Sequence, residues 1–396
     1  MNIHEKLNRT IVVFGTGEHA ARCSYALKNI GIAISYYLNN NKKVDFFCGR
    51  KVYSPDKDNV RGVFIIVAVR EGVYLTIQKQ LQELGLCEFC DFLYYKWIDK
   101  KMVLVHGNCH TAIIKKYLES SDVFSKSYAI YPIPEIHRNK EGRINDIILK
   151  NCDILIHQDI QPNNQFGYFL SDEYICKRIK PGVKEIIIPN LFGIGQAFFP
   201  LQAESNRMNN APLANGQDIN AYFPYKDSII EKCVYEGKNA KEIIDILKSD
   251  TVLERDLVID NFLFYMNKVK EREKNWDIKI YDFIMQNYRK EKLFYDIGHP
   301  SNALLKQISK GILQMIGIED DNIYTEVKLN AYEIPVYFSV KKYLGIEWND
   351  LRLRDGMNTK KMCEDMDFDE YVYEYLWWCY GISDTNTIHK GSRELW

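Results

Sequence analysis

The stretch MVLVHGNCHTAIIKKYL, residues 102–118, decides the fold of the chain. It begins with four apolar residues, Met102–Val105, which indicate a buried strand. The chain then turns through GNCH, and apolar side chains return at helical spacing up to Leu118. A strand followed directly by a helix is the building unit of parallel α/β folds, whose ligands bind outside the carboxyl ends of the strands. The sequence therefore predicts an α/β protein with a thiol, Cys109, at such an edge.

The same alternation of strands and helices extends on both sides of this turn. The apolar spacing becomes helical from residue 226 to residue 292 and again over residues 303–318. The tail should form a helix docked by Leu376, Trp377 and Trp378. We predict an α/β fold with two parallel-sheet units: a Rossmann-like domain (1–98) and a second domain (99–396) with a helical insertion and a helical tail. Strands are expected at residues 10–14, 32–38, 63–69, 90–95, 102–105, 127–131, 153–157 and 185–189.

The composition is that of a globular protein, with 46% hydrophobic and 27% charged residues. A net charge of −1 supplies no field to gather nucleic acid or acidic lipid, so no nucleic-acid partner is expected. No run approaches the roughly 20 apolar residues of a membrane span, and the polar N-terminus lacks a signal peptide. We therefore expect a cytoplasmic protein with reduced cysteines. Cys87 and Cys90 form a lone CxxC motif, interpreted as two core thiols, and no metal site is predicted.

A glycine-rich turn follows the first predicted strand. Gly15, Gly17 and Ala20 match the dinucleotide fingerprint, in which the start of a helix offers N–H groups to a phosphate, and His19 lies inside the turn. The second strand ends in Asn39 rather than in the acidic residue that holds a ribose, which disfavours an NAD-dependent oxidoreductase. The segment resembles the Rossmann-like N-terminal domain of sialic-acid-type sugar acetyltransferases, which binds a nucleotide sugar. Two interpretations stay open: a domain that binds a nucleotide or nucleotide sugar, and one that keeps the fold without a ligand.

A cysteine nucleophile needs a base, a group that orients the base, and donors for the oxyanion. Cys109 lies near a helix N-terminus, where the dipole favours a thiolate and backbone N–H groups can bind an oxyanion. Much later in the chain, Asp296 precedes His299 by three residues in the loop DIGHP. Asp296 would hold one imidazole nitrogen while the other faces Cys109. His157, at the end of another predicted strand, is a rival base. Taken without Cys109, Asp296 and His299 are better explained as a turn residue and a helix-capping residue, and it is their combination with Cys109 that favours the catalytic interpretation.

A turn of this kind with a late Asp-x-x-His resembles the SGNH/GDSL hydrolase superfamily, with Cys109 in the place of its serine and Asn108 in the place of its aspartate. The segments HGNCH, DILIHQDIQ, LFYDIGHPSN and YEIPVYFSVKKYLGIEW resemble the WcbI-type polysaccharide biosynthesis enzymes of bacterial capsule clusters. This likeness covers roughly residues 102–348. It implies an SGNH-like three-layer α/β domain, and it links the chain to coenzyme A and to acetyl transfer onto a polysaccharide.

The motifs and the resemblance together define the expected site. Gln158 matches the family's strand-end glutamine, and Asn190 matches the asparagine that completes the oxyanion hole in the superfamily. The N-terminal ligand, if there is one, would be held by Gly15, Gly17 and His19. The catalytic residues would be Cys109, His299 and Asp296, and the oxyanion or substrate would be bound by Gly107, Asn108, His110, His157, Gln158 and Asn190.

We expect an O-acetyltransferase that moves acetyl from acetyl-CoA to a hydroxyl of a polysaccharide or sugar precursor, through an acyl-cysteine or by direct transfer. One alternative is an SGNH-type esterase or deacetylase, in which water is the acceptor. The other is a non-catalytic module that binds a nucleotide sugar or glycan. The helical region 226–292 would cover the active site or form the contact of a homo-oligomer, and the enzyme would work in the cytoplasm, alone or peripheral to a membrane-bound polysaccharide assembly.

Overall fold

The computed structural model describes residues 8–41, 44–200, 202–204, 223, 225–330, 333–349 and 366–380. By its contacts the chain divides into two compact units. Unit 1 comprises Met1–Gly107 and Leu118–Ile186, and unit 2 comprises Asn108–Tyr117 and Ile187–Trp396. The boundaries between the two units thus fall at positions other than residue 98. The division into domains at residues 1–98 and 99–396 remains a prediction.

The first sheet of unit 1 has six strands in the order β3-β4-β2-β1-β5-β6. Its central strands, β1 and β5, are parallel and pair from Thr10↔Val63 to Phe14↔Val67. Every residue of β5 is buried, as expected of a continuous apolar run in a sheet that is covered on both faces. The elements are β1 (Thr10–Phe14), α1 (Glu18–Asn29), β2 (Tyr37–Leu38), β3 (Phe46–Phe47), β4 (Arg50–Tyr53), α2 (Lys57–Val60), β5 (Val63–Val67), α3 (Glu71–Glu83), β6 (Phe92–Tyr94) and the 3₁₀ helix η2 (Tyr95–Trp97).

Two sequence predictions are corrected here. The strand expected at residues 32–38 forms only at Tyr37–Leu38, because regular pairing with β1 begins where Tyr37 faces Val13. The interpretation of the CxxC motif as two core thiols is wrong for Cys90, whose side chain is exposed. The motif lies in the turn before β6, and this turn carries Cys90 to the surface.

The second sheet has four strands in the order β10-β9-β7-β8. The opening stretch of the sequence supplies its inner strand β7, which is parallel to both β8 and β9. The expected α/β class with two mainly parallel sheets is therefore confirmed. The elements are β7 (Lys101–His106), α4 (His110–Glu119), α5 (Asp122–Ser127), β8 (Tyr128–Ile130), η3 (Ile136–Arg138), α6 (Asp146–Asn151), β9 (Ile154–Gln158), η4 (Tyr168–Leu170), α7 (Asp172–Cys176) and β10 (Lys184–Ile188).

One hydrophobic core runs from the first sheet into the second. Phe64 of β5 and Leu104 of β7 belong to the same cluster of buried side chains. Between the sheets, the ring centroids of Trp97 and Tyr131 are 5.1 Å apart. The Tyr131 hydroxyl also donates a 2.7 Å hydrogen bond to the buried carboxylate of Glu88. This polar contact is fully enclosed, so it fixes the junction more specifically than apolar packing alone.

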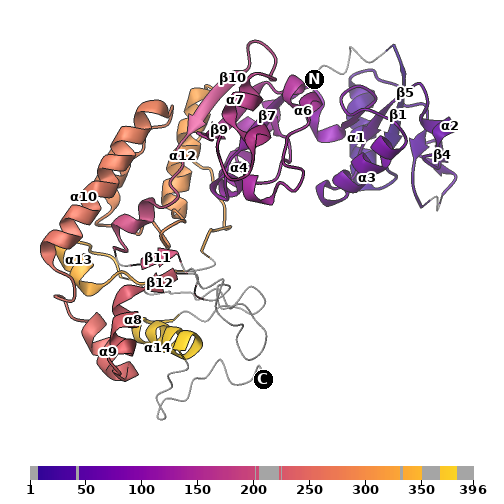
Figure 1. Cartoon of the computed structure of the whole chain (residues 1–396). Coiled ribbons are helices and arrows are strands. Elements are labelled where there is room, and N and C mark those ends of the chain that lie inside the picture. Colours follow the sequence, from indigo (N-terminus) through magenta and orange to yellow (C-terminus); the bar gives the residue numbers. More distant parts are fainter. Residues whose placement is uncertain are drawn as a thin grey trace. The chain divides into compact units, whose positions relative to one another are not determined.

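Unit 2 is mainly helical, as the periodicity over residues 226–292 predicts. In α9 the apolar positions fall on one face, so Ala240, Ile243, Ile244 and Leu247 are all buried. Helix α9 contacts both α8 and α14, and α10 contacts α13 (Figure 1). The elements are η5 (Ile194–Ala197), β11 (Gln202–Glu204), β12 (Tyr225–Asp227), α8 (Ser228–Tyr235), α9 (Ala240–Leu247), α10 (Arg255–Arg272), η8 (Glu273–Asn275), α11 (Tyr281–Asn287), α12 (Asn302–Met315), α13 (Phe338–Leu344) and α14 (Phe368–Tyr380).

The tail helix α14 docks differently from the prediction. Leu376 is fully buried as expected, but Trp377 is 41% exposed, so its predicted docking role is wrong. The helix instead buries Tyr371, Val372 and Tyr375, which lie on the same face as Leu376 at spacings of three and four residues. The Trp378 side chain lies outside the described part of the structure. Among the described residues, no helix combines the length and apolar character that crossing a membrane requires.

Candidate active site

Cys109 lies between the end of β7 and the start of α4, as the sequence predicts. Asn108 shapes this turn: its Oδ1 accepts a 3.0 Å hydrogen bond from the backbone N–H of His110. The Asn108 carbonyl accepts a second bond, 2.8 Å long, from the Thr111 hydroxyl. An asparagine side chain that bonds the first N–H groups of a helix is a common cap. The cap therefore holds the partly exposed thiol of Cys109 at the N-terminus of α4.

His299 and Asp296 form the pair that the sequence predicts. Nδ1 of His299 lies 2.7 Å from Oδ2 of Asp296. The other carboxylate oxygen accepts hydrogen bonds from the backbone N–H groups of Gly298, at 2.7 Å, and His299, at 2.9 Å. Asp296 is fully buried, whereas the His299 side chain is 24% exposed. The carboxylate is thus held on both oxygens and keeps the Nδ1 proton of the imidazole pointing towards itself.

The second nitrogen of the His299 ring is left for the thiol, and the side chains of His299 and Cys109 are hydrogen-bonded to each other. Burial alone would lower the pKa of His299. The hydrogen bonds and charges of Asp296 and Cys109 outweigh burial and raise this pKa to about 10. At neutral pH the imidazole therefore keeps its second proton. Three residues from two distant segments of the sequence meet as a thiol, an imidazole and a carboxylate in line.

Two further residues, which no sequence pattern indicates, support the arrangement of Cys109, His299 and Asp296. Tyr225 of β12 donates a 2.9 Å hydrogen bond from its hydroxyl to Oδ1 of Asp296. Gly195 of η5 lies so close to the Asp296 loop that a Cβ atom there would collide with the Asp296 carbonyl oxygen and the Cα atom of Ile297. Neither residue belongs to a motif, and only their three-dimensional neighbours reveal their part in the site.

His110, predicted to bind the oxyanion or substrate, is fully buried beside the His299 loop. Its Nε2 donates a 2.9 Å hydrogen bond to the carbonyl of Gly298. Burial and the charge of His299 lower the pKa of His110 to about 4, despite the opposing effect of this hydrogen bond and of Asp296. The ring is therefore neutral and connects the Cys109 turn to the loop of His299. Its predicted contact with the oxyanion or substrate stays a prediction.

The two predicted asparagines also meet. Nδ2 of Asn108 donates a 3.2 Å hydrogen bond to Oδ1 of Asn190. The same Asn190 oxygen accepts a 3.2 Å bond from the backbone N–H of Phe192. The oxygen of Asn190 is thus engaged by two donors, and the amide NH₂ group of Asn190 takes no part in these bonds. The structure therefore brings Asn108, the neighbour of Cys109 in the sequence, together with Asn190.

His157, Gln158 and Gly107 belong to unit 1. The carbonyl of Gly107 accepts a 2.8 Å hydrogen bond from the backbone N–H of Ile136. The His157 ring lies between two carboxylates, with Nε2 2.8 Å from Glu185 and Nδ1 2.9 Å from Asp172. Burial would lower the pKa of His157, but these carboxylates raise it to about 10. The role of His157 as a rival base remains a prediction. So does the binding of the oxyanion or substrate by His157, Gln158 and Gly107.

The predicted glycine turn lines a crevice of about 390 Å³ in the first sheet. Gly15 has a φ of +128°, and a Cβ there would collide with the carbonyl of Ala68, so the turn requires glycine. Gly17 is the N-cap residue of α1 and has no side chain to cap the first N–H groups of this helix. Nδ1 of His19 lies 2.8 Å from the Tyr95 hydroxyl. The crevice opens at the carboxyl ends of β1, β2 and β5, where the order of the strands reverses, and such a reversal is the usual ligand site of an α/β sheet.

Comparison with known families identifies the second part of the chain. A family model described as "Polysaccharide biosynthesis enzyme WcbI" matches residues 102–321, more than half of the chain. The protein belongs to this family. The match includes the Cys109 turn and the His299 loop, so the WcbI resemblance expected from the sequence is confirmed. WcbI-family membership makes the protein a polysaccharide biosynthesis enzyme.

A solved structure of low sequence identity shares the fold. It is described as WcbI, a novel polysaccharide biosynthesis enzyme, in its native form without a disulfide bond between CoA and one of its cysteines. The identity is 16% and the TM-score is 0.54, over 70% of this chain and 89% of that chain. At this identity the likeness shows the fold alone. No curated protein matches the chain.

Proposed function

We propose that this WcbI-family protein is an O-acetyltransferase that moves the acetyl group of acetyl-CoA to a hydroxyl of a bacterial capsular or surface polysaccharide or its precursor. One observation carries the proposal: Cys109, His299 and Asp296 form a hydrogen-bonded line. Such a line is the arrangement of covalent acyl transfer by cysteine. Acetyl-CoA is the donor we propose because the solved relative is described with reference to a bond between CoA and a cysteine.

The first half of the reaction forms an acyl-cysteine. The sulfur of Cys109 attacks the thioester carbonyl, and the carbon–sulfur bond to CoA breaks. His299, which holds the proton shared with Cys109, gives it to the departing CoA sulfur. One thioester replaces another, so this step needs little driving force.

The second half regenerates the site. His299, now neutral, accepts the proton of the sugar hydroxyl as the sugar oxygen attacks the acetyl carbon. The bond between this carbon and Cys109 breaks, and the thiolate is again paired with the protonated imidazole. Asp296 stabilises the charged ring in both halves without changing its own protonation. The NH₂ groups of Asn108 and Asn190 are the side-chain donors we assign to the oxyanion.

The test is to incubate the full chain with acetyl-CoA and capsular oligosaccharides and to follow CoA release and acetylated sugar. Wild-type protein should form both products in equal amounts, and Cys109→Ala should form neither. Cys90→Ala, which changes an exposed thiol in unit 1, is the matched control and should keep wild-type activity. Free acetate without acetylated sugar would instead indicate the esterase or deacetylase. Sugar binding without turnover, unchanged in Cys109→Ala, would indicate the non-catalytic module.

We also propose that the crevice of the first sheet binds a nucleotide or nucleotide sugar. The crevice is lined by the uncapped start of α1 at Gly17 and by Arg70. Backbone N–H groups at a helix start together with a guanidinium suit a phosphate group. Isothermal titration with uridine diphosphate and a uridine-diphosphate sugar should give binding that Arg70→Ala weakens. Equal affinity of Arg70→Ala would contradict this assignment. A cytoplasmic location, where both acetyl-CoA and nucleotide sugars are made, completes the proposal.

A further inference from the structure

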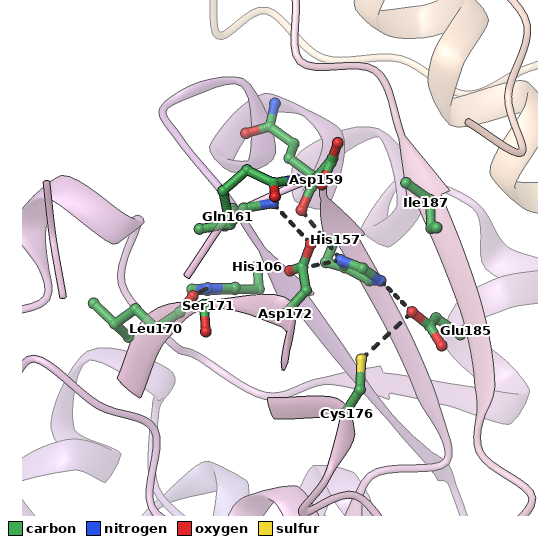
Figure 2. Close-up of polar contacts among 12 residues, drawn as sticks. His106, His157, Asp159, Gln161, Leu170, Ser171, Asp172, Cys176, Glu185 and Ile187 are labelled. Carbon is green, nitrogen blue, oxygen red and sulfur yellow. Dashed lines mark hydrogen bonds and ion pairs between the residues drawn. The ribbon is translucent and has the colours of Figure 1, made fainter. Parts of the chain in front are cut away.

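Unit 1 contains a second group of chemically active side chains. Figure 2 shows His157 at the end of β9, Cys176 at the end of α7 and Glu185 in the neighbouring strand β10. Their nitrogen, sulfur and oxygen atoms all lie within 4.8 Å of one another. Among the residues that the structure describes, no other three histidine, cysteine or acidic side chains come together in this way.

We propose that His157, Cys176 and Glu185 bind a divalent transition-metal ion of the Zn²⁺ class through Nε2, Sγ and a carboxylate oxygen. The distance from Nε2 to Glu185 Oε1 is 2.8 Å, and that from Sγ to the same oxygen is 3.4 Å. A tetrahedral Zn²⁺ with bonds of about 2.0–2.3 Å holds its ligand atoms about 3.5 Å apart. The three side chains therefore need shifts of less than about 1 Å to surround such an ion.

Asp172 orients the histidine as a metal ligand requires. Its Oδ1 lies 2.9 Å from Nδ1 of His157, and the carbonyl of Gln158 lies 3.1 Å from the same nitrogen. The hydrogen bond to Gln158 and the negative charge of Asp172 favour a proton on Nδ1, so Nε2 is the atom directed at Glu185 (Figure 2). Asp172 is itself fixed, because its Oδ2 accepts a 2.7 Å bond from the backbone N–H of Ile160. A carboxylate behind a ligating histidine is the usual outer support of a zinc site.

The thiol distinguishes a metal site from a simple charge cluster. A histidine between two carboxylates is already a complete ion pair. Cys176 adds a partly buried thiol that donates a 3.4 Å hydrogen bond to Glu185 and brings the soft donor atom that zinc prefers. A sulfur, a nitrogen and an oxygen are together the donor set of zinc and related ions rather than of Mg²⁺ or Ca²⁺. Glu185 is 42% exposed, whereas His157 is 2% exposed. The ion therefore has an entry route on the Glu185 side and room for a water as fourth ligand.

No metal site is predicted from the sequence because the spacing of the three ligands hides it. The three ligands stand at residues 157, 176 and 185, which matches none of the compact zinc motifs. Two neighbouring strands and one short helix bring them together, and these contacts are not visible as a local pattern. The metal site can be tested independently of the proposed acetyl transfer, because the test measures bound metal and not activity.

The test uses the full chain, stripped with a chelator, and Zn²⁺ or Co²⁺ alone as the probe. Wild-type protein should bind one equivalent tightly, and Co²⁺ should show the absorption band of a thiolate ligand. Cys176→Ser should lose this band and weaken Zn²⁺ binding by more than the about 10–100-fold expected on losing an outer support. Asp172→Asn should show that smaller loss with the stoichiometry still at one.

Two control variants and one further ligand variant complete the design. Cys90→Ala and Cys109→Ala should bind Zn²⁺ like wild type. Glu185→Gln, at an exposed position, should weaken Zn²⁺ binding and keep the thiolate band, and it replaces Cys176→Ser if that variant does not fold. The proposal is overturned if wild type binds no equivalent tightly, if Cys176→Ser and Glu185→Gln both bind as wild type does, or if Cys109→Ala abolishes binding instead.

Discussion

Nδ1 of His299 lies 2.7 Å from Oδ2 of Asp296, and this contact determines which ring nitrogen serves the thiol. Because Nδ1 is committed to the carboxylate, only Nε2 can exchange a proton with Cys109 or with a substrate. The backbone N–H groups of Gly298 and His299 and the hydroxyl of Tyr225 hold the carboxylate from its other oxygen. The orientation of the imidazole is therefore built into the loop before any substrate arrives.

Replacing Asp296 by Asn should remove that orientation. An amide can present its NH₂ group to Nδ1 and stabilise the wrong tautomer, as it does in other triads, with a loss of about 10³–10⁴-fold in turnover. The measurement is the steady-state rate of acetyl transfer to oligosaccharide. Asp256→Asn, at an 88% exposed position of α10, is the control and should keep the wild-type rate. A loss of less than about tenfold in Asp296→Asn would mean that the carboxylate does not serve the reaction.

The stability of the protein should depend on pH through His299. Its pKa is raised from 6.5 to about 10, so between these values the folded chain holds a proton that the unfolded chain has lost. The stabilisation is complete below pH 6.5 and disappears as the pH rises through about 10. The free energy of unfolding of wild type should therefore fall over this window more steeply than that of His299→Gln, by up to about 1.4 kcal/mol per pH unit.

Chemical denaturation at a series of pH values measures this difference. The pKa of His157 is also raised to about 10, but His157 is present in both proteins, so its contribution cancels. Parallel curves for wild type and His299→Gln would show that His299 carries no extra proton in the folded state.

Tyr225→Phe tests the support that the sequence did not reveal. The variant removes one hydrogen bond to a buried carboxylate, which should lower the free energy of unfolding by about 1.5–3 kcal/mol and reduce turnover more than it changes the KM for acetyl-CoA. Thermal melts and steady-state kinetics measure both effects. Tyr235→Phe, at a 93% exposed position, is the matched control and should change neither. An unchanged melting temperature and an unchanged rate in Tyr225→Phe would show that the Tyr225 hydroxyl supports nothing.

Gly195→Ala should disturb the same loop by steric overlap. The added methyl group would meet the carbonyl oxygen of Asp296, which is backbone and cannot move independently. We expect a loss of about 1–3 kcal/mol in stability together with a loss of activity. Gly72→Ala is the control, because its Cβ would meet nothing within 4 Å and it stands in the first turn of α3. Equal stability of both variants would contradict the close approach of residue 195 to the Asp296 loop.

The sequence predicts the framework of the fold because the inner strands β1, β5 and β7 are nearly pure apolar runs. β1 forms over Thr10–Phe14, as expected, and β7 extends the predicted run by one residue at each end, to Lys101–His106. The strand expected at residues 32–38 fails because its pairing depends on the register of β1, which is a tertiary property. Trp377 fails for a similar reason: a helix with apolar residues almost all round does not reveal which face is covered.

The site is predictable where its residues stand next to a recognisable turn. Cys109 follows a buried strand, and Asp296 precedes His299 by three residues. The turn that holds the thiol and the loop that holds the other two triad residues can therefore both be recognised in the sequence. Tyr225 stands in a three-residue strand that no local pattern marks, and Gly195 matters only because of what approaches it. Contacts of this kind between distant segments are decided by packing, and local spacing carries no signal for them.

The most direct test of the central claim is the mass of the intact protein after brief incubation with acetyl-CoA and no sugar, followed by peptide mapping. Wild-type protein should gain one acetyl group on the peptide that contains Cys109, and adding the acceptor sugar should remove it as acetylated sugar appears. Cys109→Ala should remain unmodified, and Cys90→Ala should behave like wild type. Sugar acetylation that continues in Cys109→Ala, or an acetyl group found only on another cysteine, would contradict the assignment of Cys109 as the nucleophile.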